Sequence, residues 1–108
     1  MKEVMPTAHY STVWEAVQGL KERGFTDNLE LAGNLLRAVE SGRSYAAKEL
    51  TIIEHHRFEG ASDPDDMAIV YGIESDDGRR GIVVDAYGVY ADPRLGEFLK
   101  NVKIREEQ

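Results

Sequence analysis

The first amphipathic segment of the chain predicts a helix over residues 12–23. Its apolar side chains recur at the i, i+3, i+4 and i+7 spacing of a single helical face, at Val13, Ala16, Val17 and Leu20. Thr12 and Glu15 have the spacing of a capping box, and Gly24 is placed to end the helix in a left-handed conformation. An N-terminal helix with one buried face is therefore expected.

Residues 28–45 fit two different elements. Their apolar residues match a helical stripe, which consists of Leu29, Leu31, Leu35, Leu36 and Val39. The pair Gly33-Asn34 interrupts that stripe. The alternative interpretation is a strand over about residues 34–39, entered through a turn at Gly33. The local pattern alone favours the helix by a small margin.

Beyond residue 50 the hydrophobic period changes from that of a helix to that of strands. Residues 50–58 are rich in β-branched and aromatic side chains, and residues 67–74 and 82–90 have the same character. The sequence Ser75-Asp76-Asp77-Gly78 between the last two segments is a hairpin signal. These segments predict three strands, of which the last two are antiparallel.

Asp92 and Pro93 predict the start of a closing helix, as its N-cap and its first residue. The apolar stripe that follows consists of Leu95, Phe98, Leu99 and Val102. Helices at both ends of a run of strands indicate an α+β, two-layer domain with a mainly antiparallel sheet of about four strands. We expect a single domain over residues 1–108, with a core over about residues 11–103.

The composition excludes several classes of protein. With 42% hydrophobic and 31% charged residues, the 108-residue chain is typical of a soluble globular domain. It has no cysteine, which excludes disulfides and thiolate zinc sites. Its net charge of -7 repels phosphate backbones, so nucleic acid is not expected as a partner. The apolar runs are too short to span a membrane and no leader opens the chain, so a cytoplasmic protein is expected.

Two motifs resemble those of a family of small bacterial proteins of unknown function. The first runs from Arg57-Phe58-Glu59-Gly60 into Ser62-Asp63-Pro64-Asp65-Asp66, and the second is Tyr87-Gly88-Val89-Tyr90-Ala91-Asp92-Pro93. The resemblance covers most of the chain and extends loosely to the helix that ends at Arg23-Gly24-Phe25-Thr26. Members of that family often carry the label phosphoribosylpyrophosphate synthetase.

What this resemblance implies is a fold rather than an activity. In the family the region after Phe25 resembles strand, which moves the interpretation of residues 35–39 toward a strand. True synthetases are much longer two-domain proteins, and their phosphoribosyl loop follows a strand with paired acids. Here Asp65 and Asp66 precede a predicted strand, and the sequence contains no Gly-rich phosphate loop.

The predicted sheet brings acidic and basic residues to one end, beside the start of the closing helix. The candidate ligand-binding set at this rim is Arg57, Glu59, Asp65, Asp66, Asp92 and Arg94. Carboxylates and water suit a hard cation, so Asp65 and Asp66 are the candidate ligands of Mg²⁺, the one cofactor that this chemistry suggests. The alternative is structural, with turn hydrogen bonds from Asp63 and Asp65, a helix cap by Asp92, and arginine–carboxylate pairs.

The adjacent residues His55 and His56 point to opposite faces of a simple strand, so they do not chelate one ion. His56 shares a face with Glu54, and a further ligand would have to come from His9. A partly buried or surface histidine is the simpler interpretation. No serine lies in a G-x-S-x-G motif or has an obvious base, so no catalytic residue is predicted.

Pairing Glu74 with Ile82 in the predicted hairpin divides the sheet into two faces. One face carries small residues and lets helices approach closely: Ala68, Val70, Gly72, Val84, Ala86 and Gly88. The other is apolar and aromatic and carries Met67, Ile69, Tyr71, Ile73, Val83, Tyr87, Val89 and Phe58, with Asp85, His56 and Glu54 scattered through it. Both helices are expected on the first face, which leaves the second for self-association or a ligand groove.

The expected function is that of a small non-catalytic binding or interaction module, which forms a homo-oligomer through the apolar sheet face. The competing hypothesis is a small metal-assisted enzyme that acts on a phosphorylated or nucleotide substrate at the Asp65/Asp66 rim. The residues favour the first hypothesis over an enzyme, and they identify neither a ligand nor a membrane partner.

Overall fold

The computed structural model describes residues 10, 12–58, 68–86 and 92–105 of the chain. Within them, two α-helices and a short 3-10 helix accompany a sheet of seven strands. The helices are α1 (Val13–Glu22), η1 (Ala47–Glu49) and α2 (Pro93–Lys100). The strands are β1 (Asp27–Ala32), β2 (Leu35–Ala38), β3 (Ser44–Tyr45), β4 (Leu50–Phe58), β5 (Ala68–Ser75), β6 (Arg80–Ala86) and β7 (Lys103–Ile104).

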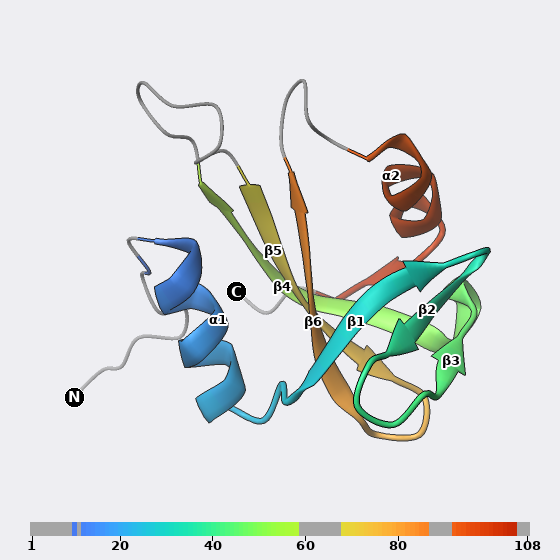
Figure 1. The fold of residues 1–108 in the computed structure, drawn as a ribbon, viewed down its shortest axis with the longest axis horizontal. Coiled ribbons are helices and arrows are strands. Elements are labelled where there is room, and N and C mark those ends of the chain that lie inside the picture. The colour runs from blue at the N-terminus through green and yellow to red at the C-terminus, as the bar shows by residue number, and fades with distance from the viewer. Residues whose placement is uncertain (1–9, 11, 59–67, 87–91, 106–108) are drawn as a thin grey trace.

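The sheet is mixed and curls into a half-barrel (Figure 1). Its strand order is β3-β2-β1-β6-β5-β4-β7. Most neighbours are antiparallel, but β1 pairs with β6 and β4 pairs with β7 in the parallel sense. The expected two-layer domain with a mainly antiparallel sheet of about four strands is therefore wrong. Besides the three strands predicted beyond residue 50, residues 27–45 form three strands and residues 103–104 form a fourth, which makes seven.

The segment with two possible interpretations forms a β-hairpin. Ala32 of β1 lies opposite Leu35 of β2, and the turn between them places Gly33 at a φ of 64°, which glycine adopts at little cost. In β2, Leu36 and Ala38 are buried while Leu35 is exposed, which is the period of a strand. The helix favoured by the local pattern is therefore wrong. The leucines of this segment fit the period of a helix and that of a strand, and the pairing of β2 with β1 is what selects the strand.

Helix α1 begins as predicted and packs on one face of the sheet. The hydroxyl of Thr12 accepts a hydrogen bond from the backbone N–H of Glu15 at 3.0 Å. Ala16 and Leu20 are fully buried against side chains of β4, β5 and β6, among them Val70. The N-terminal helix expected from the apolar stripe is therefore confirmed.

Helix α2 covers the opposite face of the same strands. The carboxylate of Asp92 caps it by accepting a hydrogen bond from the backbone N–H of Arg94 at 2.9 Å. The apolar stripe that packs onto Ile73 and Val83 consists of Leu95, Phe98, Leu99 and Val102. Figure 1 shows α1 and α2 on either side of β4, β5 and β6. The expectation that both helices share one face is wrong, because the apolar face also needs cover from water.

Strands β5 and β6 pair two residues away from the expected register, with Glu74 opposite Arg80 rather than Ile82. Because side chains alternate with a period of two, this shift leaves each residue on its expected face. Val70 packs under α1 and Ile73 under α2. Residues of the predicted hairpin that lie outside the described residues are Met67, Tyr87, Gly88, Val89 and Tyr90.

A β-bulge in β4 changes the face of the sheet to which the following side chains of that strand point. Ile52 pairs with Ile73, and Glu54 pairs with Gly72, so Ile53 is an extra residue on β4. An unbroken ladder would set Glu54 opposite Tyr71. With the bulge, β4 presents to α1 the side chains of Glu54, His56 and Phe58. To α2 it presents His55 and Arg57. The expectation that Phe58, His56 and Glu54 share the face of Tyr71 is therefore wrong.

Together the two helices bury both faces at the centre of the sheet. Under α2, Ile73 and Val83 are only 1% and 2% exposed, whereas Ile69 and Tyr71, nearer one end of β5, are half-buried. Within the described part of the chain, none of the helices has the length and apolar character needed to cross a membrane.

Candidate functional site

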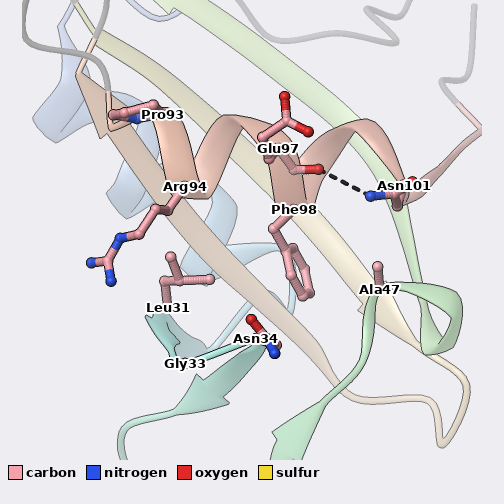
Figure 2. Close-up of a pocket in the computed structure, with 9 residues that line it drawn as sticks. All are labelled: Leu31, Gly33, Asn34, Ala47, Pro93, Arg94, Glu97, Phe98 and Asn101. Atoms are coloured by element: carbon pink, nitrogen blue, oxygen red, sulfur yellow. Dashed lines mark hydrogen bonds between the residues drawn. The ribbon is translucent and has the colours of Figure 1, made fainter.

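Helix α2 lies against the concave side of the curled sheet and leaves a cavity on each of its flanks. The larger has a volume of about 610 Å³ and lies between α2 and the β1–β2 hairpin (Figure 2). We call it the hairpin cleft. From the hairpin and η1 it is lined by Leu31, Gly33, Asn34 and Ala47. From α2 and its C-terminal end it is lined by Pro93, Arg94, Glu97, Phe98 and Asn101. Small-molecule sites span roughly 300–1,000 Å³, so its size is that of a ligand site.

The hairpin cleft has an apolar centre. Phe98 belongs to the buried stripe of α2, and its ring points toward the hairpin, as Figure 2 shows. Leu31, near the end of β1, packs against the same core cluster from the opposite wall, and Ala47 of η1 adds a third apolar contact. The turn at Gly33 brings β1 and β2 to this point, which is why the cleft forms here.

Polar groups surround this apolar centre. Figure 2 shows Arg94 extending from α2 beside Leu31, with Asn34 below the ring of Phe98. The Nε of Arg94 lies 3.9 Å from the Oδ1 of Asp92, and its side chain is 78% exposed. The carboxylate of Glu97 points away from the hairpin and accepts a hydrogen bond from Lys100 at 3.2 Å. Arg94 is therefore the charged group best placed to meet a ligand.

The amide of Asn101 closes the C-terminal end of α2. Its Nδ2 donates a hydrogen bond to the backbone carbonyl of Glu97 at 3.1 Å, so its orientation is held by the helix (Figure 2). This contact uses one donor of the amide and leaves its Oδ1 as an acceptor. The cleft therefore combines a cationic donor, a neutral amide and an apolar floor.

The second cavity lies on the opposite flank of α2, against β4 and β5, and has a volume of about 280 Å³. We call it the β4 groove. Its apolar lining consists of Ile52, Ile69, Leu99 and Ile104. Its polar lining consists of His55, Arg57, Tyr71 and Lys100, and Gly96 completes it.

The structure separates the described members of the candidate rim set. Arg57 lines the β4 groove and Arg94 lines the hairpin cleft, so the two arginines do not meet in one cavity. Asp92 caps α2, and its backbone N–H donates to the carboxylate of Asp85 on β6 at 3.3 Å. This bond joins the start of α2 to the end of β6 that carries Asp85.

The remaining members of that set, Glu59, Asp65 and Asp66, lie outside the described residues. The carboxylates considered for Mg²⁺ are among them. Residues 12–58, 68–86 and 92–105 contain no group of three histidine or acidic side chains arranged to hold a metal ion. The metal site therefore stays a prediction.

A partly buried polar cluster under α1 is chemically distinct from both cavities. The guanidinium of Arg23 donates to both carboxylate oxygens of Glu54, with 2.9 Å between Nη1 and Oε2, and the Nε2 of His56 lies 2.6 Å from Oε2. Burial alone would raise the pKa of Glu54, but the hydrogen bonds from His56 and Arg23 outweigh it and lower the pKa to about 2. His56 is partly buried, as the simpler interpretation predicted, and it does share a face with Glu54, with Arg23 as the third group of the cluster. His9 lies outside the described residues.

Sequence reasoning missed most of the lining of both cavities. Asn34 and Phe98 line one cavity only because the hairpin folds back over α2. Lys100 and Arg57 line another only because α2 lies across β4. The turn signal at Gly33-Asn34 was the one local hint of the hairpin cleft. A pattern along the chain does not report which helix flank faces which strand.

Comparisons of the chain with family models, with curated proteins and with solved structures found no match. What the protein binds is therefore inferred from the cavities and the charges around them.

Proposed function

We propose that this protein is a non-catalytic binding module that holds a compact organic acid in the hairpin cleft. The observation that carries this proposal is the cleft itself, about 610 Å³ with an apolar floor and a guanidinium at its edge. A pocket that is mostly apolar with a few convergent polar groups is the usual form of a small-molecule site.

The lining favours binding over chemistry. Among the described residues that line the cleft, Arg94 and Glu97 are ionisable, and the carboxylate of Glu97 is turned away toward Lys100. A general base or nucleophile has to come within hydrogen-bond reach of the reacting atom. Neither residue pairs with a second group as a general base pairs with a nucleophile, so this cleft fits recognition of a ligand better than catalysis.

The chemistry of the ligand follows from the same residues. Arginine presents a planar fork of donors that matches a carboxylate, and a guanidinium at the cleft edge keeps the charged end of a ligand in partial contact with water. Phe98 and Leu31 supply the surface for a ring or a branched aliphatic body. A compact aromatic monocarboxylate combines both features.

Titration with benzoate, followed by backbone amide shifts, tests the proposal. We expect saturable shifts at Asn34, Ala47 and Phe98, and weaker shifts with the neutral analogue benzamide. Arg94→Gln should weaken benzoate binding about fivefold, because an exposed ion pair contributes up to about 1 kcal/mol.

Arg37→Gln is the matched control, since Arg37 lies on β2 outside the cleft and pairs with Glu30. It should leave benzoate binding unchanged. Absence of saturable shifts with benzoate and with benzamide up to about 10 mM, a concentration that detects even millimolar affinities, would contradict the proposal.

A further inference from the structure

The β4 groove brings basic side chains together from two different elements. His55 and Arg57 reach it from β4, and Lys100 reaches it from α2. The bulge at Ile53 is what turns His55 and Arg57 toward α2. In a protein with a net charge of -7, a cavity with basic groups on two walls is a local reversal of the overall charge.

The acidic groups that the structure describes near the groove already have hydrogen-bond partners. Arg57, Ile69 and Asp85 lie in one row across β4, β5 and β6, and the carboxylate of Asp85 accepts the backbone N–H of Asp92 at 3.3 Å. Lys100 donates to Glu97 at 3.2 Å, and both side chains are 73% exposed. Such an exposed pair contributes little, so Lys100 is readily redirected to an anion. Arg57 has five N–H donors, enough to keep a protein contact and bind a ligand.

The floor of the groove is apolar and ends in a hydroxyl. Ile69 and Leu99 form the apolar surface, and the Tyr71 ring lies 6.2 Å from the ring of His55. Burial raises the pKa of Tyr71, and the charge of Asp85 adds to this, while Arg57 opposes it. Tyr71 therefore keeps its proton at neutral pH and is able to donate a hydrogen bond.

We propose that the β4 groove is a second binding site, which takes a small organic phosphomonoester. Its phosphate lies between Arg57 and Lys100, and its apolar part lies on Ile69 and Leu99. Two cations on facing walls suit a dianion better than the single charge of a carboxylate, which distinguishes this site from the hairpin cleft. The two cavities lie on opposite flanks of α2 and have no described lining residue in common, so either proposal stands without the other.

Phenyl phosphate is the probe, followed by backbone amide and methyl shifts in the intact chain at about pH 7.5. The second pKa of phosphomonoesters is about 6, so the probe is then a dianion. We expect saturable shifts at Gly96, Ile69 and Leu99 that weaken as salt is raised to about 0.3 M. Inorganic phosphate and benzoate should each bind there at least tenfold more weakly, because each lacks one half of the recognised chemistry.

Gly96 offers a variant that blocks the groove without removing a charge. A Cβ added at Gly96 meets no atom within 4 Å, so the space above it is open. Gly96→Leu fills that space and also favours the helix, because glycine is a poor helix former. We expect Gly96→Leu to abolish phenyl phosphate binding and Gly96→Ala to retain it. Both variants should unfold at a urea concentration no lower than the wild type.

Arg57→Gln should weaken phenyl phosphate binding at least fivefold, and Lys21→Gln, on α1 and away from the groove, should leave it unchanged. Absence of saturable shifts in the folded wild type would overturn the proposal. So would shifts that persist undiminished in Gly96→Leu, or binding of inorganic phosphate as tight as that of phenyl phosphate. The benzoate shifts at the hairpin cleft are a separate readout, so failure of one site is distinguishable from failure of the other.

Discussion

Glu54 shows what a single buried carboxylate does in this protein. It is 8% exposed, and it joins Arg23, the C-terminal cap of α1, to His56 of β4. The ring of Tyr10 meets His56 edge-on at 5.0 Å, and the guanidinium of Arg23 lies 5.9 Å from the ring of Phe25. A buried charge is tolerated when it is paired and hydrogen-bonded. The cluster therefore anchors the end of α1 to the sheet.

We predict that Glu54→Gln lowers the free energy of unfolding by about 2 kcal/mol at neutral pH, because it removes hydrogen bonds to a charged group. The pKa of Glu54 is about 2 in the folded protein and 4.5 ordinarily. The stabilisation is therefore present above pH 4.5 and is lost as the pH falls toward 2. Urea unfolding of wild type and variant from about pH 7 to about pH 3 should show the difference shrinking.

Glu30→Gln is the control for this series, because Glu30 pairs with Arg37 while both side chains are nearly half exposed. It should change the free energy of unfolding by less than about 0.5 kcal/mol at every pH. If the difference in free energy of unfolding between the wild type and Glu54→Gln stays constant down to about pH 3, the carboxylate charge is not what stabilises the cluster.

At the scale of elements, α2 organises both cavities. One flank of the helix carries Arg94 and Phe98 into the hairpin cleft, and the other carries Gly96 and Lys100 into the β4 groove. Its inward stripe packs onto β5 and β6 between them. Any loosening of α2 is therefore expected to affect both sites, because the helix is the wall that they share.

Asp92 determines where α2 starts, and this leads to a second prediction. Asp92→Ala should cost about 1 kcal/mol of unfolding free energy, measured in urea, because the hydrogen bond to the backbone N–H of Arg94 is lost. Asp92→Asn keeps a capping oxygen and should recover most of that stability. If both variants are as stable as the wild type but lose a ligand response, Asp92 acts at a site rather than as a cap.

At the scale of the whole molecule, contacts between distant segments close the half-barrel. Asp77, in the β5–β6 turn, accepts hydrogen bonds from Arg43 at 2.8 Å and from the hydroxyl of Tyr45 at 3.1 Å. Arg79 donates to the buried carboxylate of Asp27 on β1 at 2.9 and 3.0 Å. These polar contacts tie the β1–β3 half of the sheet to the turn of the β5–β6 hairpin.

The predicted homodimer also belongs to this scale, and it stays a prediction. Helix α2 covers Ile73 and Val83, so within the described residues the surface available to a partner centres on Ile69 and Tyr71. Light scattering over a concentration series should give twice 12.1 kDa for a dimer, and Ile69→Lys should return it to 12.1 kDa. A wild-type mass of 12.1 kDa throughout would contradict the dimer. Because Ile69 also lines the β4 groove, phenyl phosphate should dissociate any dimer formed there.

The sequence by itself determined the features that depend on neighbours along the chain. The caps at Thr12 and Asp92, the apolar stripes of both helices and the strand over residues 50–58 follow from periodicity and local hydrogen bonding. It also indicated the β5–β6 hairpin, within two residues of its register.

Only the tertiary structure decided which surfaces meet. The parallel pairings of β1 with β6 and of β4 with β7 join residues far apart in sequence, and no local pattern specifies them. The bulge at Ile53 moves Glu54 and His56 to the side of α1, although strict alternation places them under α2. The hairpin over residues 27–38 was ambiguous because its leucines fit two periods. In each case the choice between alternative structures depends on the free energy gained by burial against a distant segment. The cavities around α2 could therefore not be predicted from the sequence.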